Sequence, residues 1–315
     1  MRHYPLVLHV TNGDSARFGI EAAEIGGHVL AWRDTLHEGP VPDGFDAAGL
    51  RAVRARFLAG CGWGEVETLE SELAERDAAL DAALADDDIA LWFEHDLYDQ
   101  LQLVQVLERT GDRDGVLLIQ ADEFLGPLVP AELARWWPAR SQVTAEQAAH
   151  ARRAWAAFRS PDPAAIPGLL DEGDLHALPY VAPALRRLLE ERPDGNCLAR
   201  SERAALQVLA ERPARARELF HATQAAEEAA FFGDTWFYRR LAELGMGDRP
   251  LLAGTGGGAL PPPPPMPGSD GFAERLLRIT PNGRAVLEGQ ASRIALLGID
   301  RWTGGVHVRR PPNAA

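Results

Sequence analysis

Short apolar runs alternate with helical patterns through the first 128 residues. Four runs, residues 6–10, 28–31, 89–93 and 116–120, have the length and composition of buried strands. Between them, apolar residues recur at helical spacing, most clearly over residues 46–84 and after Leu97. Strands that alternate with helices predict a parallel sheet with right-handed crossovers. We therefore expect residues 1–128 to form an α/β domain, a Rossmann-like doubly wound parallel sheet.

The later residues predict a helical region and then a different kind of domain. Residues 129–198 have a helical pattern interrupted by prolines and would cover the sheet or link it to the C-terminal domain. Residues 199–290 combine three amphipathic helical patterns with two apolar runs, at 251–252 and 276–279, that would pair as a hairpin. This order resembles a winged-helix-like domain. Residues 291–315 are expected to form a tail that packs back on the protein.

A proline-rich stretch separates the two strands of the expected hairpin. Residues 254–271 contain five consecutive prolines and several glycines. Such a composition cannot pack a core, so we expect a mobile loop at the hairpin tip. A peptide ligand for an SH3-like partner is the alternative interpretation.

Composition and charge exclude several kinds of site. The chain has 315 residues and no lysine, which excludes a Walker-type phosphate lysine, a Schiff-base lysine and a lysine general base. The net charge is −14, and residues 201–315 hold 14 arginines against 12 acids, so the acidic excess lies within residues 1–200. This excess argues against a broad nucleic-acid surface on the N-terminal part.

The sequence is typical of a cytoplasmic protein. No apolar run reaches the roughly 20 residues that a membrane span needs, and the start of the chain lacks a signal-peptide cleavage pattern. Cys61 and Cys197 are far apart and form no disulfide framework. We expect a cytoplasmic location and no membrane partner, and the sequence leaves the oligomeric state open.

Polar segments come directly after all four predicted strands. In chain order they read NGDS, WRDTLHEGP, EHDLYDQ and ADEF. In a parallel sheet these segments emerge at one edge, the carboxyl edge, where doubly wound folds bind ligands. The sequence therefore predicts a site at this edge.

The segment after the third strand is the richest in ionisable groups. Glu94, His95, Asp96 and Asp99 come after the apolar run, and helical spacing resumes at once. Asp96 and Asp99 would also suit a helix N-terminus, where carboxylates cap the backbone and complement the helix dipole. Capping accounts for one or two of these acids and leaves the others unexplained, which favours a functional site.

Crowded carboxylates at this edge favour a bound cation. Unpaired carboxylates raise each other's pKa, and a divalent cation with oxygen ligands removes that penalty. We expect Asp14, Glu94 and Asp96 to hold Mg²⁺ or Mn²⁺ or to orient a water. The competing interpretation is an ion-pair network without metal, in which Arg33 and Arg301 supply the counter-charges.

Histidines add a second possibility at the same edge. His95, between Glu94 and Asp96, would act as a general base with a raised pKa, although a single histidine is more often structural. Together with His9 and His37 it would shift the metal preference toward a transition metal.

The NGDS segment would position the ligand. Gly13 would allow a tight turn, and Ser15 with the following amides would bind an anion at the start of a helix. An Asx-turn with a helix N-cap is the simpler alternative. Ser15 would be a nucleophile only if His95 or His307 met it, because the chain has no late Asp-x-x-His segment. The ligand-binding residues predicted at this edge are Asn12, Gly13, Ser15, Asp34, Glu38, Asp99 and Gln100.

The winged-helix-like segment has its own candidate residues. Arg239 and Arg240 belong to the predicted helix that would enter a DNA major groove. The segment is nearly neutral overall, and many winged helices serve only in protein contacts. DNA binding is therefore possible but not favoured.

Several long motifs resemble one bacterial family. They are HVTNGDS from His9, WRDTLHEGPVP from Trp32, LWFEHDLYDQLQL from Leu91 and GIDRWTGGVH from Gly298. The chain resembles the domain of unknown function 1835 family over nearly its whole length. The resemblance implies an N-terminal α/β domain with a C-terminal helical extension, and it implies no known reaction.

The sequence supports two functional hypotheses. The first is a metal-assisted hydrolase or phosphoryl-transfer enzyme that acts on a small anionic or nucleotide-like substrate. In it Asp14, Glu94 and Asp96 hold the cation or orient water, and His95 moves a proton. The second is a regulator that senses a ligand and binds DNA or a protein partner through its winged-helix-like domain.

Overall fold

The computed structural model describes residues 7–86, 88–193, 198–257, 260–261 and 270–313. The chain divides into two compact units. The first unit comprises residues 1–57, 66–186 and 304–306, and the second comprises residues 58–65, 187–303 and 307–315.

A five-stranded sheet organises the first unit. Its strands lie in the order β2 (His28–Ala31), β1 (Val7–Thr11), β4 (Asp88–Phe93), β5 (Val116–Gln120) and β6 (Ser141–Gln142). The first four strands run parallel, and only the two-residue β6 is antiparallel. The four predicted strands are therefore present, and the prediction of a mostly parallel sheet is confirmed. The short, exposed β6 has too few residues to leave a period-two pattern in the sequence.

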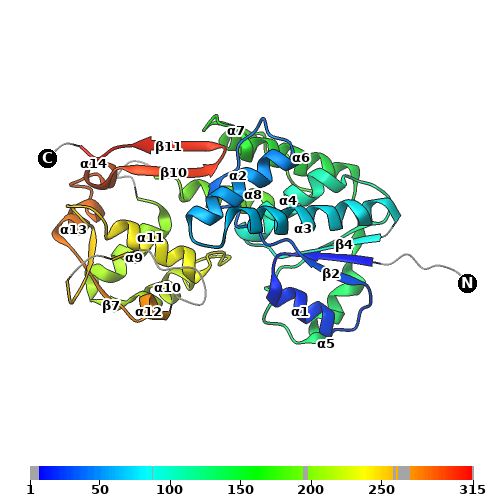
Figure 1. Ribbon diagram of the computed structural model, residues 1–315, viewed down its shortest axis with the longest axis horizontal. Helices are drawn as coiled ribbons and strands as arrows, with labels where there is room; N and C mark the ends of the chain where they lie inside the picture. The colour runs from blue at the N-terminus through cyan, green and yellow to red at the C-terminus, as the bar shows by residue number, and fades with distance from the viewer. Residues whose placement is uncertain (1–6, 87, 194–197, 258–259, 262–269, 314–315) are drawn as a thin grey trace, which may run out of the picture. The chain divides into compact units, whose positions relative to one another are not determined.

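Helices lie on both faces of this sheet. Figure 1 shows α1 and α5 on one side and α3 and α4 on the other. The helical elements of this part of the chain are α1 (Asp14–Ala22), α2 (Ala47–Gly60), α3 (Val66–Asp86), α4 (Leu97–Thr110), α5 (Pro130–Trp136), the 3₁₀ turn Trp137–Ala139, α6 (Ala145–Arg159), α7 (Ala165–Glu172) and α8 (Val181–Glu190). A two-residue strand, β3 (Gly39–Pro40), lies between β2 and α2 in the chain.

Alternation along the strands builds the core. Ala90 and Trp92 of β4 project to one face and pack in a buried cluster with Ile20 of α1 and Leu133 of α5. Leu91 lies between them in the chain, and its side chain points to the opposite face because successive side chains of a strand alternate. It is also fully buried. Burial on both faces explains why the sequence of β4 is a continuous apolar run.

The region expected to be a separate helical cover belongs to the first unit as far as residue 186. Helix α6 packs on α4 and buries Ala148, Ala151, Ala154 and Phe158. Small alanines on this face allow two helices to approach closely. Between residues 66 and 303 the chain passes from the first unit to the second after residue 186, and the expected boundaries at 128 and 198 remain predictions.

The second unit is mainly helical with a small antiparallel sheet. Its elements are α9 (Arg200–Glu211), β7 (Ala214–Arg215), α10 (Ala216–Gln224), α11 (Asp234–Leu244), β8 (Leu252–Gly254), α12 (Asp270–Ala273), β9 (Leu276–Ile279), α13 (Pro281–Leu287), α14 (Arg293–Leu297), β10 (Ile299–Gly304) and β11 (Val306–Arg310).

The expected hairpin is part of that sheet. The order is β7-β9-β8, and Leu252 pairs with Ile279 in antiparallel register. The winged-helix interpretation remains a prediction. Most of the proline-rich stretch, residues 258–259 and 262–269, lies outside the described residues, and so does Cys197.

The end of the chain contributes to both units. In the second unit, Arg301 is buried and lies 2.6 Å from Glu202, and Trp302 stacks on His307 with ring centroids 4.2 Å apart. Residues 304–306 belong to the first unit, where the Gly305 amide donates to the Phe158 carbonyl over 2.9 Å.

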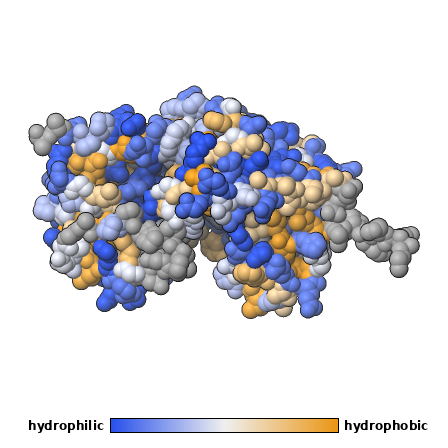
Figure 2. All heavy atoms as spheres, in the orientation of Figure 1, coloured by the Kyte–Doolittle hydropathy of each residue, from blue (hydrophilic) through white to orange (hydrophobic). Residues whose placement is uncertain are grey.

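One face of the first unit exposes apolar side chains. Figure 2 shows hydrophobic atoms gathered over the part that Figure 1 labels α1 and α5. Phe18 of α1 is 57% exposed, and Phe124 and Val129, which precede α5, are also exposed. Among the described residues, no helix has the length and apolar character needed to cross a membrane.

Candidate functional site

The candidate site lies where the strand order of the sheet reverses. Strand β1 pairs with β2 on one side and with β4 on the other, so the segments after β1 and β4 both start at the carboxyl edge of neighbouring strands. This is the switch point where open α/β sheets bind ligands. The two segments meet there, because the Asn12 side-chain amide donates to Asp99 Oδ2 over 2.7 Å and the Tyr98 hydroxyl donates to the Asn12 carbonyl over 3.3 Å.

Three buried carboxylates gather at this point. They are Glu94, Asp96 and Asp99, which are 4%, 3% and 1% exposed. One carboxylate oxygen from each lies within 4.8 Å of the others. We call this group the acidic cluster. Glu94 comes directly after β4, and the other two residues belong to the start of α4.

Local hydrogen bonds hold the acidic cluster in place. Asp96 is the N-cap of α4, and its Oδ1 accepts from the Asp99 amide over 3.2 Å. Asp99 Oδ1 accepts in turn from the Glu94 amide over 2.8 Å. The capping interpretation is therefore correct for Asp96, but Asp99 serves the turn before the helix rather than the helix itself.

The segment after β5 completes the enclosure of Glu94. The Leu125 amide donates to Glu94 Oε1 over 2.8 Å. Gln100 of α4 donates through Nε2 to the Glu94 carbonyl over 2.6 Å, while its buried Oε1 has no hydrogen-bond partner. A buried acceptor without a donor costs free energy, which a polar group or ion beside it would offset.

The acidic cluster has no cationic neighbour among the described residues, because none of the ion pairs there involves its carboxylates. Burial raises the pKa of Glu94. Burial and the adjacent Glu94 charge raise the pKa of Asp96 to about 7, and burial with both neighbouring charges raises the pKa of Asp99. Without a cation, the cluster therefore retains protons at neutral pH. A divalent cation could replace those protons.

Asp14 does not join the acidic cluster. Its carboxylate is exposed and lies 2.5 Å from Arg33 and 3.2 Å from Arg17. Arg33 thus acts as the counter-ion that the sequence suggested. The structure brings Asp99, rather than Asp14, together with Glu94 and Asp96.

Gly13 and Ser15 stand at the start of α1. Gly13 is the N-cap with φ −167°, an extended conformation that any residue adopts, so the expected tight turn that needs glycine is absent. A side chain at Gly13 would meet open space. Ser15 is exposed in the first turn of α1. The Asn12 side chain binds Asp99, so the predicted Asx-turn is not its role.

His95 contacts aromatic side chains, unlike Glu94 and Asp96 beside it in the sequence. Its ring centroid lies 5.1 Å from that of Phe124 and 6.0 Å from that of Tyr180. Burial lowers the pKa of His95, and the nearby charge of Asp122 opposes this only in part. The expectation of a raised pKa was therefore wrong, because burial outweighs the charge of Asp122. The lowered pKa keeps the imidazole neutral at pH 7, as a general base requires.

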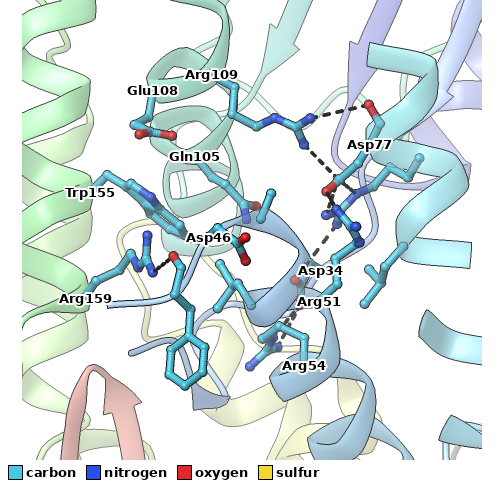
Figure 3. A pocket seen from close by; sticks show the side chains of 15 residues that line it. Asp34, Asp46, Arg51, Arg54, Asp77, Gln105, Glu108, Arg109, Trp155 and Arg159 are labelled. Carbon is cyan, nitrogen blue, oxygen red and sulfur yellow. Dashed lines mark hydrogen bonds and ion pairs between the residues drawn. The ribbon is translucent and has the colours of Figure 1, made fainter. Parts of the chain in front are cut away.

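Asp34 lines a separate, arginine-lined cavity of about 160 Å³, and Glu38 is linked to it through Arg54. Asp34 is buried and lies 2.7 Å from Arg54, which also donates to the Glu38 carbonyl over 2.7 Å. Figure 3 shows this ion-pair network, in which Asp77 contacts Arg51, Arg76 and Arg109. The arginines are matched by carboxylates and carbonyls, so the network is a structural one between α2, α3 and α4.

The remaining histidine and arginine candidates have other partners. His9 is buried, with Nε2 2.7 Å from the Gly26 carbonyl and Nδ1 accepting from Trp92 Nε1 over 2.9 Å. Both ring nitrogens are engaged, which leaves His9 no position for a metal. Arg301 pairs with Glu202 rather than with the acids of the sheet edge, and His307 contacts Asp300 over 2.7 Å. His37 lies against Tyr98 with ring centroids 5.9 Å apart.

Arg239 and Arg240 are partly or fully withdrawn from solvent. Arg240 is 7% exposed and lies 3.2 Å from Glu243, and Arg239 donates to the Cys61 carbonyl over 3.3 Å. Both contacts lie inside the second unit. A groove-reading helix needs exposed arginines, so these contacts favour a structural role for this pair.

Comparison with known proteins adds no family to this description. No protein-family model matches the chain, and a search of the curated proteins finds no significant match. The resemblance to the domain of unknown function 1835 family therefore remains a prediction.

Proposed function

We propose that the protein binds a divalent cation, Mg²⁺ or Mn²⁺, at the acidic cluster and uses it in hydrolysis or phosphoryl transfer on a small anionic, nucleotide-like substrate. One observation carries the proposal: Glu94, Asp96 and Asp99 are buried together at the switch point without a cationic partner among the described residues. Buried carboxylates normally have a counter-charge or bind a metal.

The chemistry of the three residues suits a hard cation. Each carboxylate has two oxygens and about four lone-pair positions, so the hydrogen bonds that it accepts leave capacity for a metal. Mg²⁺ prefers carboxylate and water oxygens and usually keeps several waters. The buried Gln100 Oε1 is a further oxygen without a donor. A bound cation would supply Lewis-acid activation of a phosphoryl or carbonyl oxygen.

The start of α1 would receive the anionic part of the substrate. Helix N-termini present free amides and a positive dipole end to anions. Gly13 leaves open space beside these amides, and Ser15 adds an exposed hydroxyl. Because the Asn12 amide reaches Asp99 over 2.7 Å, this anion site and the acidic cluster are neighbours.

His95 would transfer the proton. Its lowered pKa favours a neutral imidazole, and its buried Nδ1 has no hydrogen-bond partner. Asp122 and Tyr180 lie beside it and would orient the ring.

Cation binding is the direct test of this proposal. Chelator-treated protein would be titrated calorimetrically with Mn²⁺ and Mg²⁺, and its thermal stability followed with nucleoside mono-, di- and triphosphates. We expect one cation per chain for the wild type and none for Asp96→Asn or Asp99→Asn, whose side chains keep their shape. Glu67→Gln changes an exposed acid of α3 and is the matched control. Equal cation binding by the wild type and both cluster variants would refute the proposal.

A further inference from the structure

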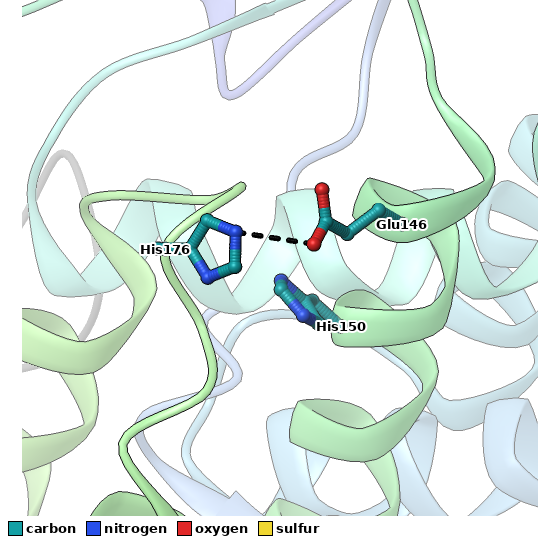
Figure 4. Close-up of side chains that lie close together, drawn as sticks. All are labelled: Glu146, His150 and His176. Atoms are coloured by element: carbon teal, nitrogen blue, oxygen red, sulfur yellow. Dashed lines mark ion pairs between the residues drawn. The ribbon is translucent and has the colours of Figure 1, made fainter.

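A second group of side chains of types that can bind a metal lies in the first unit. Figure 4 shows Glu146, His150 and His176 converging. Glu146 and His150 are four residues apart on α6, and His176 comes from the segment between α7 and α8. Helix geometry places positions i and i+4 on one face, so α6 presents both ligands in the same direction. One ligand atom of each residue lies within 4.8 Å of the others.

One separation in this group is close to that between two ligands of a tetrahedral metal. His176 Nε2 lies 3.1 Å from Glu146 Oε1. At zinc–ligand distances of 2.0–2.2 Å, two tetrahedral ligands are about 3.4 Å apart. The two imidazole rings are close as well, with centroids 5.4 Å apart and planes at 75°. Two imidazoles and one carboxylate are ligands that zinc prefers, whereas three carboxylates suit Mg²⁺ or Mn²⁺.

His150 is buried and has one long polar contact. The residue is 3% exposed, its Nε2 lies 3.5 Å from Asp174 Oδ1, and its Nδ1 has no hydrogen-bond partner. A buried, unpaired ring nitrogen costs free energy. Coordination of the ring would fix its tautomer and orientation and offset the cost of burying it.

The segment that carries His176 is held in place. Gly173 ends α7 with φ 71°, in the left-handed region, and so turns the chain back toward α6. Leu175 and Leu178 on either side of His176 are buried. The Gln147 side chain donates to the Ala177 carbonyl over 3.2 Å. The histidine is thus positioned by its neighbours while its own side chain stays 68% exposed.

Asp174 occupies the position of a supporting carboxylate. Its Oδ1 lies 3.4 Å from His176 Nδ1 and 3.5 Å from His150 Nε2, and Arg153 holds its Oδ2 over 3.0 Å. A carboxylate that accepts from the second ring nitrogen of a metal-binding histidine fixes the tautomer and increases ligand basicity. This arrangement leaves His176 Nε2, which faces Glu146, as the ligand atom.

We infer that Glu146, His150 and His176 form a binding site for a single Zn²⁺ ion, with Asp174 supporting His176. Glu146 and His176 are exposed, so solvent can supply the fourth ligand. Three protein ligands and one water are the arrangement of catalytic rather than structural zinc. This site is separate from the acidic cluster, uses different ligands and does not depend on the proposed function.

Zinc titration of the full chain without an affinity tag tests this inference. Chelator-treated protein would compete for Zn²⁺ with a chromophoric chelator, and Co²⁺ would serve as a visible probe of tetrahedral coordination. We expect one Zn²⁺ per chain. His176→Ala and Glu146→Gln should each weaken binding by at least about 100-fold, because even supporting residues change metal affinity by 10–100-fold, and Asp174→Asn should weaken it by about tenfold.

Two controls make the result decisive. His28→Ala removes an exposed histidine of β2 in the same unit and should leave zinc affinity unchanged. His176 and Glu146 are both exposed, so their substitution should not unfold the protein, whereas a substitution of buried His150 could. Circular dichroism checks that the variants are folded. Equal affinity in wild type, His176→Ala and His28→Ala would overturn the inference. Loss of zinc binding in Asp96→Asn, with retention in His176→Ala, would also overturn it by placing the ion at the acidic cluster.

Discussion

Replacing Asp96 with asparagine should stabilise the protein in the absence of metal, and only at neutral and alkaline pH. The pKa of Asp96 rises from its ordinary value of 3.8 to about 7 in the folded protein, because burial and the Glu94 charge disfavour its ionised form. The folded state therefore binds this proton more tightly than the unfolded state. Stability contributed by the protonated group is present at low pH and declines as the pH rises from about 4 to about 7.

The size of the effect is set by that pKa difference. At 1.36 kcal/mol per pKa unit, ionised Asp96 costs about 4 kcal/mol above pH 7. Asparagine has nearly the same shape, keeps an oxygen that can accept from the Asp99 amide at 3.2 Å, and carries no charge. We expect the variant to exceed the wild type in free energy of unfolding by about 4 kcal/mol at pH 8 and by less than about 1 kcal/mol at pH 4.

Urea unfolding of chelator-treated protein, followed by tryptophan fluorescence at several pH values between 4 and 8, measures this difference. Trp92 lies buried in β4, next to the acidic cluster in sequence, and reports on its unit. Saturating Mn²⁺ should then raise the stability of the wild type at pH 8 without affecting the variant. A variant no more stable than the wild type at pH 8, or a difference independent of pH, would refute the reasoning. Glu67→Gln should show neither change.

Three further predictions concern stability. Asp34→Ala leaves buried Arg54 without its carboxylate and should lower the free energy of unfolding by about 3–5 kcal/mol in chemical denaturation; a loss under about 1 kcal/mol would contradict the ion-pair account. Burial acts to raise the pKa of Glu202, but Arg301 and Arg293 lower it to about 2. The stability that ionised Glu202 contributes is therefore present above pH 4.5 and should be lost as the pH falls toward 2. Glu202→Gln should remove this dependence of the unfolding midpoint on acid pH. Gly304 has φ 61° and approaches the Phe158 carbonyl, so Gly304→Ala should cost at least about 1 kcal/mol in thermal unfolding, and an unchanged melting temperature would contradict this packing.

The amino-acid sequence alone determined the four parallel strands of the first unit and the helical segments between them. Buried apolar runs identified all four parallel strands, and the abrupt change after Phe93 identified the segment that carries the acidic cluster. These features are local, because strand and helix periods are written in neighbouring residues. The winged-helix interpretation had weaker support, since three short helices and a hairpin occur in more than one arrangement.

Only the tertiary structure decided which side chains meet. The sequence favoured Asp14 over Asp99 as the third member of the cluster, yet Asp14 pairs with Arg33, and Asp99 is held beside Glu94 by the Asn12 side chain. Asp34 comes after β2 at the same edge but is held by Arg54 of α2, 20 residues later in the chain. The Glu146–His150 spacing was visible in the sequence, but nothing in it indicated that His176 would join them. Periodicity encodes the direction of a side chain within its own element, whereas distances between elements depend on strand order and helix packing, which a linear pattern does not contain.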